Sequence, residues 1–192
     1  MKLRPYQICV SGAASGETVE ASKHLAQKIG EAIAKHDHTV LTGATIGLPN
    51  YAAEGYKAAG GKMSVGISPA SSKVEHVLKY RLPIKAYDTI LYTGLHYVGR
   101  DALLIQSSDA VVSIGGRLGT LHEFTIAMET DTPIGFLQGA GGVSEQIQTL
   151  MSLAHPLRHG AFVTFDEDAD KLIAELTNFL DEERSKYHTL YQ

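Results

Sequence analysis

The sequence predicts an α/β protein with a Rossmann-like, doubly wound, mostly parallel sheet that carries helices on both faces. Apolar, strand-like runs alternate with helical patterns from one end of the chain to the other. Such alternation is typical of βαβ units, whose right-handed crossovers place helices against a parallel sheet. Small-residue turns follow the first, second and fifth strand-like runs, at the edge where open sheets of this type bind ligands.

Short apolar runs bounded by turn residues are expected to form the strands. They cover residues 6–10, 39–41, 63–67, 88–92, 110–114, 133–137 and 161–165. Between them, apolar residues recur three and four apart, which predicts helices. In the first helix the residues expected on one buried face are Val19, Ser22, Ala26, Ile29 and Ile33.

The remaining helices are placed by their end signals and apolar spacing. Pro49 suits the first turn of the second helix, and Gly60-Gly61 ends it. Val98, Ala102 and Ile105 are expected on one side of the helix over residues 96–106. The others are a short helix over 74–80, a helix that buries Leu121, Phe124 and Met128, and helices over 144–153 and 168–183.

Length and composition bound the class of protein. The 192 residues suit a single nucleotide-binding domain, 1–192, whose polar tail, 185–192, is expected either to fray or to dock on a partner subunit. Apolar residues make up 44% and charged residues 20%, which is typical of a globular chain. A net charge of −4 argues against nucleic-acid binding, and the apolar runs are too short for a membrane span. With a single cysteine and no secretory signal at its start, the chain is expected in the cytoplasm.

The stretch from Val111 to Glu123 carries the main functional signal. A buried strand, a Gly115-Gly116 break and a helix opened by Gly119-Thr120 would leave unpaired backbone N–H groups aimed at one spot. The positive end of the helix dipole adds to them, so the junction suits an anion, above all a phosphate. The residues expected to hold it are Ser11, Gly12, Ala13, Gly43, Gly115, Gly116, Arg117, Leu118, Gly119 and Thr120.

Plainer explanations exist for the same residues. A glycine pair after a strand is often only a tight turn, and Glu123 is also an acid that the dipole favours at a helix start. For Arg117 the side chain would touch phosphate or face solvent, and its backbone N–H is the stronger candidate. The turn after the first strand lacks the dinucleotide fingerprint and Ser11 lacks a nucleophile elbow, which disfavours NAD and serine-hydrolase chemistry. The nine histidines form no ligand pattern, so we expect no metal.

The pattern Gly115-Gly116-x-x-Gly119-Thr120-x-x-Glu123 resembles the signature of the Lonely Guy (LOG) and molybdenum-cofactor-carrier-like proteins of the SLOG superfamily, once labelled lysine decarboxylase-like. Further matches are the small-residue loop at 11–15, the glycine turn at 42–47, and the helix end at 58–61 before the strand residues 65–67. Residues 94–101 stand where the family places an arginine ahead of the central strand. The likeness covers roughly residues 6–138.

This resemblance implies a homodimer that holds a nucleotide or a nucleotide-bearing cofactor. We expect a nucleoside monophosphate or related phosphate ligand as its partner, and no separate cofactor. In the LOG branch the glycine-threonine loop receives the 5′-phosphate, and an arginine and a glutamate assist hydrolysis of the base–ribose bond. By position these catalytic residues would be Arg100 and Glu123. The two residues between the glycine pair and Gly119 are closer to the carrier-like branch, and Asp101 stands where the LOG branch has a lysine. The alternative is therefore a non-enzymatic carrier or sensor of a nucleotide or molybdenum cofactor.

Overall fold

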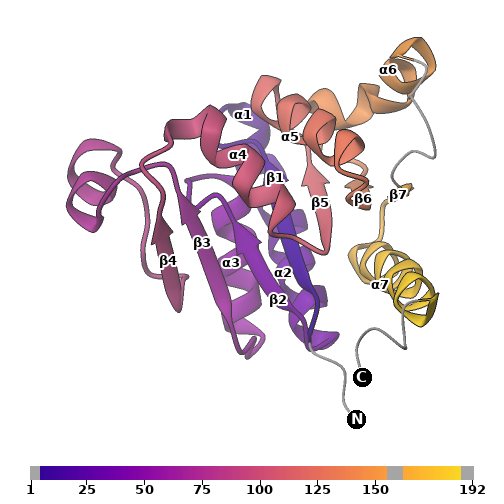
Figure 1. The fold of residues 1–192 in the computed structure, drawn as a ribbon, viewed down its shortest axis with the longest axis horizontal. Helices are drawn as coiled ribbons and strands as arrows, with labels where there is room; N and C mark the ends of the chain where they lie inside the picture. Colours follow the sequence, from indigo (N-terminus) through magenta and orange to yellow (C-terminus); the bar gives the residue numbers. More distant parts are fainter. Residues whose placement is uncertain (1–4, 155–161, 187–192) are drawn as a thin grey trace.

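We obtained a computed structural model that describes residues 5–154 and 162–186. Within these ranges, seven strands form one parallel sheet in the order β4-β3-β2-β1-β5-β6-β7 (Figure 1). The strands are β1 (Gln7–Gly12), β2 (Thr39–Thr42), β3 (Ser64–Ser68), β4 (Thr89–Tyr92), β5 (Ala110–Ile114), β6 (Ile134–Leu137) and β7 (Val163–Asp166). The prediction of a Rossmann-like, doubly wound fold is confirmed.

Helices lie between successive strands, and one more follows the last strand. They are α1 (Glu17–Ala21), α2 (Lys23–Lys35), α3 (Leu48–Ala58), α4 (His96–Gln106), α5 (Leu118–Glu129), α6 (Ile147–Ala154) and α7 (Ala169–Lys186). A π-helical turn (Glu75–Lys79) precedes β4, and a 3-10 turn (Gly142–Gln146) precedes α6. No helix among the described residues is both long and apolar enough to span a bilayer.

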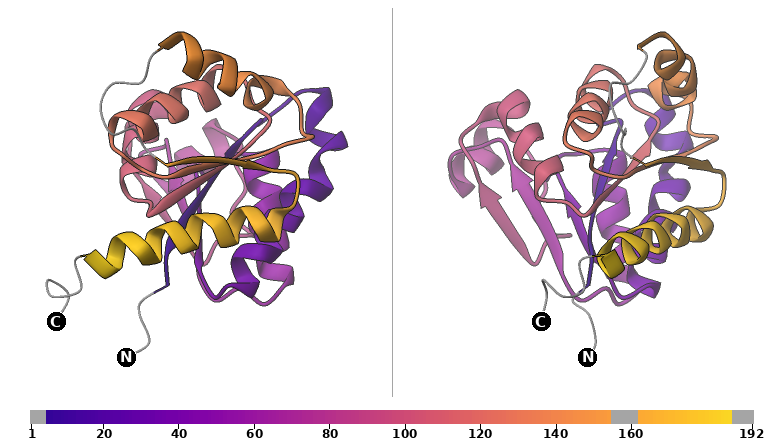
Figure 2. Two further views of the ribbon diagram at one scale, coloured as in Figure 1. Left: turned by 90° about the vertical axis from the view of Figure 1, so that its right-hand side faces the viewer. Right: turned by 45° about the vertical axis from the view of Figure 1, so that its right-hand side comes forward.

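The sheet lies between two helical layers, so the fold has two apolar cores. Figure 1 shows α4 and α5 in front of the sheet and α2 and α3 behind it, and α7 packs beside α2 (Figure 2). Successive side chains of a strand point to opposite faces of the sheet, so β1 contributes to both cores. Ile8 and Val10 belong to one core, and Cys9 belongs to the other. Full burial of each large apolar side chain contributes about 1.5–3 kcal/mol.

The chain order creates one reversal in the sheet. The chain starts at the central strand β1, adds β2, β3 and β4 on one side, and then crosses by α4 to β5 on the other side. After β1 and after β5 the chain therefore enters helices on opposite faces of the sheet. This leaves a crevice between the carboxyl ends of these two strands. Ser11, Gly12 and Ile114 end these two strands.

Two helix predictions need correction. The helix expected to run through Val19 and Ile33 is broken at Ser22, whose backbone leaves helical geometry and whose buried hydroxyl donates to the carbonyl of Ala140 at 3.5 Å. Val98, which is expected on one side of the helix with Ala102 and Ile105, is 72% exposed, whereas Ile105 is buried. The side of α4 that faces inward instead carries Arg100, Asp101, Leu104 and Ile105.

Smaller differences occur near the C-terminus. The helix expected from residue 144 begins as a 3-10 turn, and α6 starts only at Ile147, because residues 142–144 pack against the glycine turn after β5. The last helix extends through Ser185 and Lys186, which were expected in the tail. Ala161, the expected start of the last strand, and the tail residues 187–192 lie outside the described residues.

Candidate functional site

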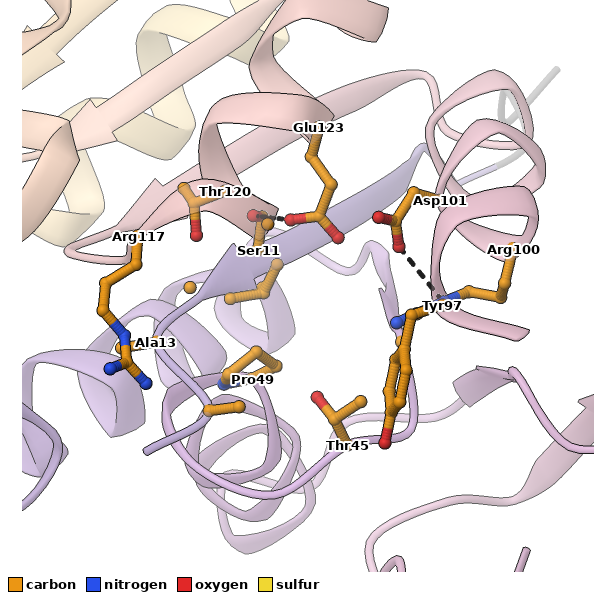
Figure 3. A pocket seen from close by; sticks show the side chains of 15 residues that line it. Ser11, Ala13, Thr45, Pro49, Tyr97, Arg100, Asp101, Arg117, Thr120 and Glu123 are labelled. Carbon is orange, nitrogen blue, oxygen red and sulfur yellow. Dashed lines mark hydrogen bonds and ion pairs between the residues drawn. The ribbon is translucent and has the colours of Figure 1, made fainter. Parts of the chain in front are cut away.

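A cavity of about 240 Å³ opens at the carboxyl ends of β1 and β2, beside the starts of α3 and α5 (Figure 3). It lies at the reversal in strand order, where an α/β sheet of this type binds its ligand. Residues from both helical layers reach it. Its lining consists of Val10, Ser11, Gly12, Ala13, Ala14, Gly43, Thr45, Pro49, Tyr97, Arg100, Asp101, Arg117, Gly119, Thr120 and Glu123.

Most residues predicted for the site meet in this cavity. Those in its lining are Ser11, Gly12, Ala13, Gly43, Arg100, Arg117, Gly119, Thr120 and Glu123. Gly115 and Gly116 are not among the lining residues, and their backbones face the loop after β6. Leu118 also lies outside the lining, with its side chain 81% exposed.

The turn at Gly115 and Gly116 is held by a second glycine turn. Ser144 donates its hydroxyl to the carbonyl of Gly115 at 2.5 Å, and Val143 N–H donates to the carbonyl of Gly116 at 2.9 Å. A Cβ on Gly142 would lie 2.5 Å from the carbonyl oxygen of Gly116, so only glycine permits this approach. The two loops therefore fix the course of the chain into α5.

The amino end of α5 lies at the cavity and has no side-chain cap. Arg117, at the N-cap position, makes no side-chain capping hydrogen bond, and Gly119 and Thr120 in the first turn line the cavity. The first N–H groups of a helix have no intrahelical acceptor, and the dipole adds partial positive charge there. Gly116 lies so close that a Cβ on it would meet the Thr120 hydroxyl oxygen at 2.0 Å. This end of the cavity suits an anion.

The Arg117 side chain has a partner that the sequence did not suggest. Its Nη2 donates to the backbone carbonyl of Ser15 at 3.2 Å and to the Ser15 hydroxyl at 2.9 Å. The guanidinium thus links the loop after β5 to the loop after β1 along one edge of the cavity. A positive charge at this edge adds to the anion preference of the α5 terminus.

Arg100 brings a buried positive charge to the opposite side. Its side chain is 4% exposed, and its Nε lies 3.3 Å from Oδ1 of Asp101. Neither Nε nor Nη1 makes a hydrogen bond with any of the described residues. A buried guanidinium with unused donors is costly, so this side chain favours an anionic or carbonyl-bearing group in the cavity. Gly43 makes room for it, because a Cβ there would lie 1.5 Å from Nη1.

Asp101 joins Arg100 to α5. Its Oδ1 faces Arg100, and its Oδ2 lies 3.0 Å from Nδ1 of His122. The carboxylate is buried, whereas the His122 side chain is 40% exposed. Asp101 therefore compensates the charge of Arg100 from within the protein and fixes the orientation of α4 relative to α5.

Glu123 has the chemistry of an acid–base group. It is buried, and Ser11 donates its hydroxyl to Oε2. Burial, together with the negative charge of Asp101, raises the pKa of Glu123 to about 7, against the opposing effects of Ser11, Arg100 and His122. A carboxyl group whose pKa lies near neutral pH can both accept and release a proton under physiological conditions.

Several lining residues were missed by the sequence analysis. Tyr97 stands one helical turn before Arg100, so its position relative to Arg100 was a usable signal. Thr45 and Pro49 follow β2, beside the predicted residue Gly43. Asp101 was noticed only as a departure from the family pattern, and its contacts with two elements depend on the tertiary fold. No three His, Cys, Asp or Glu side chains in the described ranges gather as metal ligands would.

Comparisons with known proteins identify the family of this chain and support its fold. The model of the SLOG cluster4 family matches residues 5–171. An uncharacterised protein of Archaeoglobus fulgidus is 32% identical over 132 residues, which cover 69% of this chain and 80% of that protein. The molybdenum cofactor carrier protein of Chlamydomonas reinhardtii superposes with a TM-score of 0.73 and 28% identity, over 93% of this chain and 99% of that one. The molybdenum cofactor binding protein of Rippkaea orientalis superposes with a TM-score of 0.74 and 24% identity, over 94% of this chain and 99% of that one.

The contact between Gly43 and Arg100 gives the first prediction. In Gly43→Ala the new methyl group displaces the guanidinium, so the affinity for inorganic phosphate should fall about tenfold or more, as expected when a charge-assisted hydrogen bond is lost. Isothermal titration calorimetry measures it. Gly99→Ala, on the same helix as Arg100, is the control, since its methyl group meets only the side chain of Leu95. Unchanged phosphate affinity in Gly43→Ala would show that Arg100 does not serve the anion.

The pKa of Glu123 gives the second prediction. Because the folded protein holds this carboxyl with a pKa of about 7 instead of 4.5, its protonated form favours folding below pH 4.5, and this contribution is lost as pH rises through 7. Relative to Glu123→Gln, wild type should therefore lose on the order of 3 kcal/mol of unfolding free energy between pH 4.5 and pH 8. Urea denaturation at several pH values measures the difference. Glu129→Gln, an exposed change on the same helix, is the control, and a pH-independent difference would contradict the buried-carboxyl account.

Proposed function

The chain belongs to the SLOG cluster4 family, and from this premise we propose that it binds a nucleoside 5′-monophosphate, or a closely related phosphate ligand, and hydrolyses its base–ribose bond. The phosphate would lie at the amino end of α5, where the backbone donors of Gly119 and Thr120 face the cavity. The ribose would lie beside Glu123, one turn further along the same helix. This placement follows the role that the LOG resemblance implies for the glycine-threonine loop.

One observation carries the proposal: a single cavity joins an uncapped helix terminus, a buried arginine with unused donors and a carboxyl group with a pKa near 7. A phosphate site alone needs only the first of these. Hydrolysis of an N-glycosidic bond needs a carboxylate, since positive charge develops on the ribose ring as the bond breaks. Glu123 and Arg100 are both in the lining and supply these charges.

The reaction balances with water as the only co-reactant. Glu123 in its carboxylate form accepts a proton from a water molecule, whose oxygen forms a bond to C1′ of the ribose. The C1′–N bond breaks, and its electron pair leaves with the base, which takes up a proton from the solvent while Glu123 releases the one it accepted. The products are the free base and ribose 5-phosphate. Arg100 would stabilise negative charge on the phosphate or on the departing base. Ser11, which donates to Glu123, would hold the carboxylate in place.

A carrier or sensor is the second candidate. The solved structures named above are a molybdenum cofactor carrier protein and a molybdenum cofactor binding protein, and their fold covers more than nine-tenths of this chain. Arg117 and Leu118, the two residues between the glycine pair and Gly119, also agree with that branch. Such a protein would use the same phosphate-binding terminus and Arg100, but it would release its cargo unchanged.

An enzyme assay separates these two functions. Purified protein is incubated with AMP, GMP, CMP or UMP, and free base is detected by chromatography. We expect base release, with a rate that rises with pH through about 7 because the carboxylate form of Glu123 acts as the base. Glu123→Gln should lower the rate about 100-fold or more while the nucleotide still binds.

Three other results would contradict parts of the proposed hydrolase function. Wild-type rates in Glu123→Gln would remove Glu123 from the mechanism, and Glu129→Gln controls for loss of an acid on α5. Tight binding without base release by wild type would favour the carrier. If no phosphate compound raises the melting temperature, the phosphate-binding proposal is wrong.

We also propose that the chain forms a homodimer through α4 and the edge strand β4, in keeping with the dimer that the resemblance implies. Leu95, the N-cap residue of α4, and Val98 within that helix are three apart and are 50% and 72% exposed. Leu91 of β4 pairs with Ile67, which belongs to the core beneath α4, and is itself 53% exposed. Exposed apolar side chains gathered beside an edge strand are typical of an interface.

The dimer prediction is tested by light scattering after size-exclusion chromatography. Wild type should elute with the mass of two chains, and Val98→Glu should be monomeric because it places a charge in the apolar contact. Met63→Glu, a charge at an apolar side chain that is 46% exposed outside α4 and β4, is the control and should remain dimeric. A monomeric wild type, or a dimeric Val98→Glu, would contradict the assigned surface.

A further inference from the structure

Tyr97 forms an aromatic wall of the cavity on the side away from the amino end of α5. It lies on α4 one turn before Arg100, and its side chain belongs to the cavity lining. The residue is 46% exposed, although aromatic rings of this size are usually largely buried. Part of the ring is therefore available to a ligand within the cavity.

Neighbouring side chains hold this ring in place. Tyr80 packs edge-on against it, with ring centroids 5.7 Å apart and an interplanar angle of 77°. The Tyr80 hydroxyl shares a hydrogen bond of 2.7 Å with Nδ1 of His96, the residue before Tyr97. The guanidinium carbon of Arg100 lies 6.0 Å from the ring centroid. A ring fixed before binding loses little conformational freedom when a ligand stacks on it.

The backbone before Tyr97 is also constrained. His96 has φ of 55°, an unfavourable value for a residue with a side chain, at the first position of α4. Its N–H donates to the carbonyl of Pro69 at 3.1 Å, so the loop after β3 holds this start of the helix. Strained backbone that is retained next to a cavity commonly serves to aim a side chain.

The cavity separates three kinds of contact along its length. Figure 3 shows Thr120 and Arg117 at one side, Tyr97 at the other, and Glu123 between them. A ligand whose phosphate lies at the amino end of α5 and whose sugar lies beside Glu123 would extend its third part toward Tyr97. Thr45 and Pro49 also line the cavity, and they offer one hydroxyl and otherwise apolar surface.

We propose that Tyr97 is a specificity-determining residue, an aromatic platform on which the planar ring system of the ligand stacks. The cavity accordingly selects phosphate compounds that carry a planar aromatic group, and two fused rings more strongly than one, because they cover more of the tyrosine face. This inference rests on the proposed function, since it takes the phosphate to lie at α5. The inference adds the chemical class of the ligand group that binds at the Tyr97 end of the cavity.

The test compares ligands that differ only in the ring. Dissociation constants are measured by calorimetry for AMP, UMP and ribose 5-phosphate in a Glu123→Gln background, which prevents turnover. AMP should bind about tenfold more tightly than ribose 5-phosphate, with UMP between them. Tyr97→Leu should remove most of this advantage while leaving the affinity for ribose 5-phosphate unchanged. Tyr97→Phe, which keeps the ring, should retain it.

A matched control replaces a tyrosine outside the cavity. Tyr51→Leu removes a ring whose hydroxyl donates to Glu20 and which Lys23 covers at 4.5 Å, and it should leave all three constants unchanged. An equal AMP advantage in Tyr97→Leu and its parent would overturn the inference, as would a loss in Tyr97→Phe as large as in Tyr97→Leu. Absence of ribose 5-phosphate binding in the parent would instead refute the proposed phosphate site, so the two failures are distinguishable.

Discussion

The site depends on one buried charge, the guanidinium of Arg100. Burial of an uncompensated charge is unfavourable, and Asp101 compensates this one from the same helix at 3.3 Å. Gly43 permits the guanidinium to lie against the turn after β2, because any side chain there would occupy its place. Burial is the main cause of the raised pKa of Glu123, and the negative charge of Asp101 raises it further, so the carboxylate that compensates Arg100 also affects the acid–base group.

A second constraint is the rigid course of the chain into α5. The glycine turn after β5 packs backbone to backbone against the turn after β6, and Ser144 hydrogen-bonds to both Gly115 and Ser113. Gly115 and Gly116 thus allow the close contact between the two turns that fixes the direction of α5, while Gly119 and Thr120 line the cavity. Donors fixed before a ligand arrives need no reorganisation on binding, which increases their contribution to anion affinity.

Hydrolase and carrier would share most of this arrangement. Both need a phosphate-binding terminus, and both benefit from a compensated arginine that retains unused donors. The two functions differ in their need for a carboxyl group that changes protonation near pH 7, which a carrier does not require. Glu123, which accepts a hydrogen bond from the Ser11 hydroxyl, is therefore the residue that the hydrolase needs and the carrier does not, among the two functions proposed for this SLOG cluster4 protein.

The fold class, the strands and most of the cavity-lining residues could be predicted from the sequence. Apolar alternation and glycine turns are local properties, and the carboxyl ends of parallel strands must share an edge. The tertiary structure was needed to show which face of α4 is buried. The inward positions of Arg100 and Asp101 depend on contacts with the turn after β2 and with α5, and they leave Val98 exposed. The tertiary structure also decided that Gly116 supports the cavity without lining it, that Arg117 binds Ser15, and that the pKa of Glu123 is raised, because each depends on residues far away in the chain.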